Sequence, residues 1–201
     1  GLRPTVASSF NCVFMPMPAI AVTRHQRENS VPVLATAPGS QPVLLFRASP
    51  AVGPNAFALP GGTIVLIDEL VAEAQHDDEI LSVLAHEIGH VQERHTLRHV
   101  LQTSAAGVLV AAVLGDVVSA TSYAVAAVPT FLLNARYSRA FEVEADTFGF
   151  ALLDKAGIDR GHFARFLTRL EQKHGGKSEP PGWISSHPGA EERARAALGD
   201  R

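Results

Sequence analysis

The sequence HEIGH at residues 86–90 constrains this chain more than any other segment. Apolar residues recur at helical spacing from position 80 to position 91, which predicts that the segment lies within a helix. Because His86 and His90 are four residues apart, they project from one face of that helix, one turn from each other. Their imidazoles can therefore bind one zinc ion together, and Glu87 lies within reach of a water molecule on that ion. The alternative is a surface helix that carries this sequence by chance and binds no metal.

A catalytic zinc ion has three protein ligands and one open position, so a third ligand is needed. The extended pattern HExxHxxGxxH is not followed, since Glu93 and Thr96 occupy its glycine and last histidine positions. Glu142 and Asp146, four residues apart on a later predicted helix, share one face. This spacing predicts Glu142 as the third ligand and Asp146 as the acceptor for the second ring N–H of a ligand histidine. Glu144 is predicted to point away from that face, into solvent.

The composition restricts the class of protein. A chain of 201 residues, 46% hydrophobic and 18% charged, fits one globular domain with a sizeable core. The net charge of -3 and the lack of a basic stripe predict no nucleic-acid partner. The single cysteine, Cys12, excludes an internal disulfide framework and a cysteine-rich zinc site. The chain begins at Gly1, from which we expect a piece of a longer protein whose signal peptide or membrane anchor has been removed.

The hydrophobic pattern predicts an α+β fold that is mostly helical, with a small β-sheet before the helix that carries His86. Two short apolar segments are predicted strands, at residues 43–48 and 63–67, and residues 54–62 form the predicted loop that precedes the second. The predicted helices follow at residues 68–75, 78–100, 136–156, 160–174 and 188–198. Asp68, Asp77 and Asp159 are the predicted N-caps of three of them, and Gly157 and Gly199 follow the ends of two. Residues 175–189 are a predicted loop.

Residues 104–133 are the most hydrophobic stretch, and Asp116 and Pro129 interrupt it. The apolar segments that remain are about 12 residues long, short of the ~20 that a membrane-spanning helix needs. One interpretation is a buried or half-buried helical hairpin in the core. The other is a lid, or a hairpin that touches a membrane, and the sequence does not separate the two.

HEIGH together with SRAFEVEAD, at residues 138–146, resembles the membrane-associated zinc proteases of metallopeptidase family 48. That family includes HtpX-like heat-shock proteases, CAAX prenyl proteases, and periplasmic relatives that degrade misassembled outer-membrane proteins. The resemblance runs from about Asn55 to the C-terminus, because residues 55–70, NAFALPGGTIVLIDEL, are similar to the family's strand before the active-site helix. It implies a zincin-like metalloprotease of the gluzincin type. Residues 1–42 are rich in Pro, Ser and Thr without a sustained period and are predicted to be an irregular N-terminal segment, which leaves residues 43–201 as the catalytic domain.

The resemblance also implies roles for single residues. His86, His90 and Glu142 would hold one Zn²⁺ per chain, Glu87 would be the catalytic base, and Asp146 would support a ligand histidine. Two further residues are implied less directly.

The first of these is His187. Ser185-Ser186-His187-Pro188 resembles the family's late His-Pro segment, which makes His187 a candidate oxyanion stabiliser or a fourth ligand in a self-blocked resting state. The second is Arg139, a candidate for orienting carboxylates near the site. His95 and His99 form a second pair at helical spacing, but His95 is rotated off the ligand face and is predicted to lie on the helix surface or to pack.

The predicted function is zinc-dependent cleavage of unfolded or misassembled protein substrates, in quality control at the bacterial cell envelope. Several spanning helices that membrane members of the family carry have no counterpart here, which favours a periplasmic location or a membrane anchor outside the chain. An extended substrate is predicted to pair with the strand at residues 63–67. The predicted substrate-binding residues are Gly61, Gly62, Thr63, Ile64 and Val65. The alternative function is a zinc-stabilised chaperone or assembly module with latent proteolysis.

Overall fold

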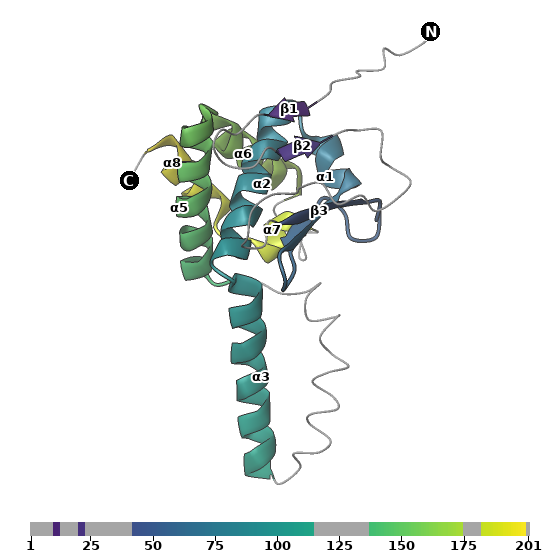
Figure 1. The fold of residues 1–201 in the computed structure, drawn as a ribbon, viewed down its shortest axis with the longest axis vertical. Coiled ribbons are helices and arrows are strands. Elements are labelled where there is room, and N and C mark those ends of the chain that lie inside the picture. Colours follow the sequence, from purple (N-terminus) through teal and green to yellow (C-terminus); the bar gives the residue numbers. More distant parts are fainter. Residues whose placement is uncertain (1–9, 13–19, 23–41, 115–136, 175–181, 200–201) are drawn as a thin grey trace.

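The computed structural model describes residues 10–12, 20–22, 42–114, 137–174 and 182–199 (Figure 1). Its strands are β1 Phe10–Cys12, β2 Ile20–Val22, β3 Val43–Arg47, β4 Ala56–Ala58 and β5 Thr63–Ile67. Its helices are α1 Asp68–Glu73, α2 Asp77–Gln92, α3 His95–Leu114, α5 Arg139–Ala156, α6 Gly161–His174, α7 Trp183–Ser186 and α8 Ala190–Leu198. The fold is therefore mostly helical with a small sheet ahead of the helices, which confirms the predicted fold class.

The sheet beside the helices has the strand order β3-β5-β4, with β3 parallel and β4 antiparallel to β5. β5 is the central strand, and four of its five residues are buried. β4 lies within residues 54–62, which the sequence predicted as a loop. That prediction was wrong because a strand of three residues is too short to show a period, and it forms by pairing with β5.

α2 and α5 pack against each other along most of their length, and two glycines permit this close approach. A Cβ atom added to Gly89 on α2 would lie 2.6 Å from the backbone oxygen of Ala145. A Cβ atom added to Gly149 on α5 would lie 3.1 Å from the backbone nitrogen of His86. The two backbones thus touch where a side chain would hold them apart, and this contact brings the acidic face of α5 against the histidines of α2.

The hydrophobic core lies between the sheet, α2, α5, α6 and α8. Leu66, Val83, Phe166 and Leu167 are fully shielded from solvent. Burying a side chain of this size stabilises the fold by roughly 1.5–3 kcal/mol. This core fixes α2 in place, and the two predicted histidine ligands lie on the half of α2 nearest its C-terminus.

The structure corrects the predicted end of the HEIGH helix. The sequence predicted one helix to position 100, but α2 ends at Gln92 and α3 begins at His95. Between them Arg94 adopts a left-handed backbone with φ 53°, which no α-helix accommodates. The apolar periodicity continues across this break, so the pattern did not reveal it.

Several other boundaries agree with the sequence to within a few residues. Ser138 caps α5 by accepting a hydrogen bond from Phe141 N at 3.2 Å, and Gly157 ends it with φ 71°. Asp159 accepts from Gly161 N at the start of α6. Asp68 and Asp77 are the first residues of α1 and α2 rather than their caps. α7 lies in the predicted loop 175–189, because a single four-residue turn carries no period.

α3 extends away from the body formed by the other elements (Figure 1). It runs as one helix to Leu114, and residues 115–136, which include most of the predicted hairpin, lie outside the described residues. In the part of the chain that is described, no helix has the length and apolar character needed to cross a membrane. β1 and β2 pair antiparallel within the segment 1–42 that was expected to be irregular.

Candidate metal centre

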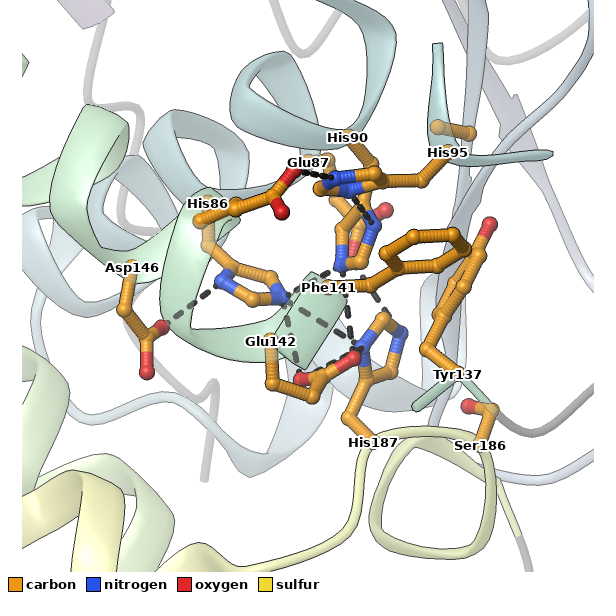
Figure 2. Close-up of polar contacts among 12 residues, drawn as sticks. His86, Glu87, His90, His95, Tyr137, Phe141, Glu142, Asp146, Ser186 and His187 are labelled. Atoms are coloured by element: carbon orange, nitrogen blue, oxygen red, sulfur yellow. Dashed lines mark hydrogen bonds and ion pairs between the residues drawn. The ribbon is translucent and has the colours of Figure 1, made fainter. Parts of the chain in front are cut away.

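Three separate parts of the chain direct polar side chains at one buried point (Figure 2). α2 supplies His86, Glu87 and His90, α5 supplies Glu142, and the residue after α7 is His187. Four of these side chains, all except Glu87, each offer one metal-ligand atom, and the four atoms lie within 4.8 Å of one another. None of the five residues is more than 1% exposed.

The distances between the ligand atoms fit a tetrahedral ion. The Nε2 atoms of His86 and His90 are 2.9 Å apart, and each lies 3.5 Å from a carboxylate oxygen of Glu142. Nδ1 of His187 lies 3.3 Å from Nε2 of His86 and 3.1 Å from Oε1 of Glu142. Tetrahedral zinc with bonds of about 2.0–2.1 Å separates its ligand atoms by ~3.3 Å. The residues present therefore fit the metal that the sequence predicted.

The side of the site around His86 is held by charge. Nδ1 of His86 lies 2.8 Å from Oδ1 of Asp146, as the spacing on α5 predicted. Burial alone raises the pKa of Asp146, but the hydrogen bonds and charge of Arg193 and the contact with His86 outweigh burial and lower that pKa to about 2. Asp146 is therefore ionised and accepts the Nδ1–H, which leaves Nε2 of His86 free to bind a metal.

Arg193 on α8 is the charged residue that the sequence did not point to. Its guanidinium donates to both carboxylate oxygens of Asp146 at 2.7 Å and lies 2.6 Å from Oε2 of Glu142. Burial raises the pKa of Glu142, and the charges of His187 and Arg193 reverse that effect and lower it. Arg193 is only 4% exposed, and it lies on the last helix, so its proximity to the site arises from the packing of α8.

Arg139 does not lie where it was expected. Its guanidinium is exposed and forms an ion pair with Glu192 at 3.3 Å, whereas Arg193 contacts the two site carboxylates. The family resemblance implied Arg139 as a residue that orients the carboxylates. It is the first residue of α5, and its side chain there is 78% exposed.

Glu87 is fixed by a residue that the sequence also missed. Nε1 of Trp183 donates to Oε1 of Glu87 at 3.0 Å, and Nε2 of His187 lies 3.4 Å from the same oxygen. The other oxygen, Oε2, is buried and has no hydrogen-bond partner among the described residues. Glu87 thus presents one restrained oxygen and one oxygen that is able to take up a proton.

The side of the site around His90 differs from the prediction. His95 is completely buried, with Nδ1 3.0 Å from Nδ1 of His90 and Nε2 3.0 Å from Oε2 of Glu144. The sequence predicted that His95 is rotated off the ligand face and lies on the helix surface or packs. His95 packs, but the helix break before it turns its ring toward His90. Glu144, predicted to lie in solvent, is 42% exposed and contacts His95 and Arg98. Burial lowers the pKa of His90 well below its usual value, so its imidazole is neutral.

Tyr137, two residues before α5, covers His90. Its ring stacks on His90 with the centroids 4.0 Å apart, and its hydroxyl lies 2.7 Å from Oγ1 of Thr96, which donates its proton to the carbonyl of Ala58. The backbone nitrogen of Tyr137 donates to Ser186 O at 3.1 Å. Burial raises the pKa of the Tyr137 hydroxyl. The hydroxyl therefore stays protonated.

The predicted substrate strand is not free to pair. β5 has β3 on one side and β4 on the other, so the backbone of Thr63, Ile64 and Val65 is already hydrogen-bonded on both edges. Strand addition at β5 is therefore excluded in this structure. Gly61 and Gly62 have φ values of 96° and 89° and form the turn into β5, and Gly62 packs close to Val91 on α2. The sequence showed a strand here but not its neighbours.

Comparison with known proteins agrees with this site. The sequence model described as peptidase family M48 matches residues 23–200. A putative beta-barrel assembly-enhancing protease of Vibrio cholerae is 36% identical over 148 residues, which cover 69% of this chain and 31% of that protein. Metalloprotease YcaL of Escherichia coli is 35% identical over 149 residues, 70% of this chain and 56% of that protein. Mitochondrial metalloendopeptidase OMA1 of Schizosaccharomyces pombe is 30% identical over 148 residues, 71% of this chain and 42% of that protein.

The match to the family model covers most of the chain, including HEIGH and the acidic helix that supplies Glu142. The chain spans only about a third to just over half of the length of these relatives. The buried cluster of two histidines and a downstream glutamate is the metal-binding arrangement expected of such proteases. The chain belongs to peptidase family M48.

Proposed function

We propose that this chain is the catalytic domain of a zinc-dependent endopeptidase that cleaves unfolded or misassembled proteins at the bacterial cell envelope. One observation carries the proposal: the Glu142 carboxylate lies 3.5 Å from Nε2 of both His86 and His90. Three side chains from two helices thereby form the His-His-Glu set typical of catalytic zinc sites, with a glutamate beside them. A chance HExxH on a surface helix would not be buried, nor would it meet a carboxylate from another helix.

The residues around the site divide the chemistry among them. A bound zinc ion supplies Lewis acidity, which polarises the scissile carbonyl and makes water nucleophilic near neutral pH. Glu87 accepts a proton from the attacking water through Oε2 as the water oxygen bonds to the carbonyl carbon. Glu87 then gives that proton to the amide nitrogen as the C–N bond breaks. Trp183 keeps the glutamate in position by holding its other oxygen.

His187 has two proposed roles, oxyanion stabiliser or fourth ligand in a resting state. Its Nδ1 lies among the ligand atoms, 3.3 Å from Nε2 of His86, which favours the fourth-ligand role in this conformation. A fourth protein ligand would fill the position that a catalytic zinc ion keeps open. We therefore expect His187→Ala to keep its zinc and to cleave casein faster than the wild-type chain. A lower kcat with the same zinc content would instead assign His187 to the oxyanion.

The proposed substrates and location rest on the relatives. Proteins named beta-barrel assembly-enhancing proteases in Vibrio cholerae and Escherichia coli share about a third of their residues with this chain over the aligned region. Their names support protein substrates and a role at the bacterial cell envelope, either in the periplasm or anchored to a membrane. Membrane association would then involve a segment before residue 1 or the hydrophobic stretch 104–133.

The alternative is a zinc-stabilised chaperone or assembly module with latent proteolysis. One observation favours this alternative. All four ligand residues and Glu87 are buried, so a substrate reaches them only if it displaces the side chains that cover them. An assay of casein cleavage with and without a chelator separates the two functions. An endopeptidase loses its cleavage when zinc is removed, and a chaperone shows none in either state.

The experiment that tests the proposal is Glu87→Gln. The amide keeps the shape of Glu87 but cannot take up the proton, so we expect unchanged zinc content and at least a 100-fold loss of casein cleavage. Zinc content is measured by elemental analysis of the purified chain. Cleavage at the wild-type rate would refute the role of Glu87, and a wild-type chain without zinc would refute the metal site.

A further inference from the structure

Each predicted zinc-binding histidine uses one ring nitrogen for the metal and leaves the other to be held by the protein. For His86 the holding group is Asp146, a carboxylate, which is the common arrangement. For His90 the only partner that the described residues offer to Nδ1 is Nδ1 of another histidine, His95, at 3.0 Å. An imidazole as the partner of a ligand imidazole is a different arrangement, and it has consequences for both rings.

His90, His95 and Glu144 form a series of two hydrogen bonds, and the groups at its two ends determine where the ring protons lie. At one end Nε2 of His90 must keep its lone pair to bind a metal, so the single ring proton of His90 is on Nδ1. At the other end Oε2 of Glu144, a carboxylate oxygen, accepts a hydrogen bond from Nε2 of His95 at 3.0 Å. A neutral His95 with its proton on Nε2 has its lone pair on Nδ1, where it accepts the Nδ1–H of His90. Only this assignment makes both hydrogen bonds and leaves His90 ready for metal.

The surroundings of His95 restrain its ring. The ring is completely buried and stacks on Phe141 with the centroids 4.4 Å apart at an interplanar angle of 11°. The Arg98 guanidinium also lies over the Phe141 ring, 4.4 Å from its centroid, and donates to Glu144 Oε2 at 2.8 Å. Phe141 thus restrains the plane of the His95 ring, and Arg98 holds the Glu144 carboxylate that His95 contacts.

The backbone supports the same arrangement. On a continuous helix His95 would lie five positions after His90 and point to another side. Arg94 takes a left-handed conformation with φ 53°, and the chain restarts as α3 with His95 at its first position. Non-glycine residues in this conformation are uncommon and concentrate at functional sites. The break is what returns His95 to the ligand.

We infer that His95 is a positioning residue of the zinc site: its Nδ1 accepts the Nδ1–H of His90, and Glu144 fixes the tautomer of His95 that allows this. The inference rests on the proposed zinc site and adds to it a hydrogen-bonded path from a buried ligand to a half-exposed carboxylate. Partners of this kind raise metal affinity by roughly 10- to 100-fold.

The test compares two substitutions at position 95 in the full chain. His95→Asn keeps an acceptor, since its side-chain oxygen can take the place of Nδ1, whereas His95→Leu fills similar space without one. The affinity for Zn²⁺ is measured by competition with a chromogenic chelator. We expect His95→Leu to bind Zn²⁺ about 10- to 100-fold more weakly than the wild-type chain, and His95→Asn to recover most of that loss.

The melting temperature of the metal-free chain separates positioning from a structural role. A residue that only packs would lower the metal-free melting temperature of both variants and leave the zinc affinity of the folded protein unchanged. A second pair of substitutions, at the half-exposed Glu144, leaves the buried residues unchanged. Glu144→Gln keeps an acceptor oxygen and should hold zinc within about 3-fold of wild type, while Glu144→Ala should bind it more weakly than Glu144→Gln.

Each outcome decides between the two claims. If wild type binds Zn²⁺ and His95→Leu binds it equally tightly, the positioning role is overturned and the proposed zinc site stands. If His95→Asn is as weak as His95→Leu, an acceptor at this point is not what matters, and the role is also overturned. If wild type itself binds no Zn²⁺, both the proposed function and this inference fail.

Discussion

The two sides of the metal centre are built on different principles. Around His86 the supports are charged and buried: Asp146 accepts from the ring, and Arg193 neutralises both Asp146 and Glu142. Around His90 Nδ1 the support is a second imidazole, and the charges beyond that imidazole, Glu144 and Arg98, are each about 42% exposed. The first side depends on the interior of the fold, and the second leads to its surface. The two histidine ligands of one site are therefore held in different ways, one by buried charges and the other by a neutral ring that leads to a surface carboxylate.

The largest effect should come from Arg193→Ala in the metal-free chain. The substitution leaves two buried carboxylates without their counter-charge, which costs about 3–5 kcal/mol of unfolding free energy. Urea denaturation of the metal-free protein measures this loss. The matched change on the other side is Arg98→Ala, which removes one partner from a half-exposed pair and should cost at most ~1 kcal/mol. Equal losses at the two positions would remove the contrast between the sides.

Acid should weaken the side around His86 through Asp146. The folded-state pKa of Asp146 is about 2, below the ordinary aspartate value of 3.8. A depressed carboxyl pKa contributes stability that is present above pH 3.8 and is lost as the pH falls toward 2. The shift corresponds to about 2 kcal/mol.

The measurement is the unfolding free energy of the metal-free chain between pH 5 and pH 2, for wild type and for Asp146→Asn. We expect the acid-dependent loss to be smaller by about 2 kcal/mol in the variant. His95→Asn should change it less, because the carboxyl on that side, Glu144, is 42% exposed and solvent screens its contact with His95. The same acid dependence in wild type and Asp146→Asn would contradict this explanation.

The smallest effect should come from Arg139→Ala. Its guanidinium and the Glu192 carboxylate are 78% and 67% exposed, and such pairs contribute about 0–1 kcal/mol. We expect zinc affinity and casein cleavage within 2-fold of wild type. A loss of zinc affinity comparable with that expected for His95→Leu would show that Arg139 supports the metal site, contrary to its exposed position.

The sequence predicted the parts of the site that depend on local geometry. Two histidines at i and i+4 must share a helix face, and so must Glu142 and Asp146, whatever the rest of the chain does. The structure brings these four residues together on α2 and α5. The sequence missed Trp183, Arg193 and His95, because each reaches the site through packing of an element or through a break in a helix, and neither leaves a periodic signal.

The sheet shows the same limit. The apolar segment at residues 63–67 predicted β5, and the structure contains it. Its place between β3 and β4, which rules out strand addition there, depends on how the three strands pair, and the residues of β5 alone do not show that. β4 has three residues, and such a strand exists only because its neighbour provides the hydrogen bonds.

The sequence by itself determined the helix that carries His86, Glu87 and His90, the carboxylate on a second helix, and the mostly helical class of the fold, because periodicity and side-chain chemistry act over a few residues. Tertiary structure alone decided how closely the helices approach, and therefore whether three ligand residues meet. It did so through Gly89 and Gly149, which let the backbones of α2 and α5 touch. It also decided which charge neutralises the site and which ring holds His90, because packing between distant segments fixes both.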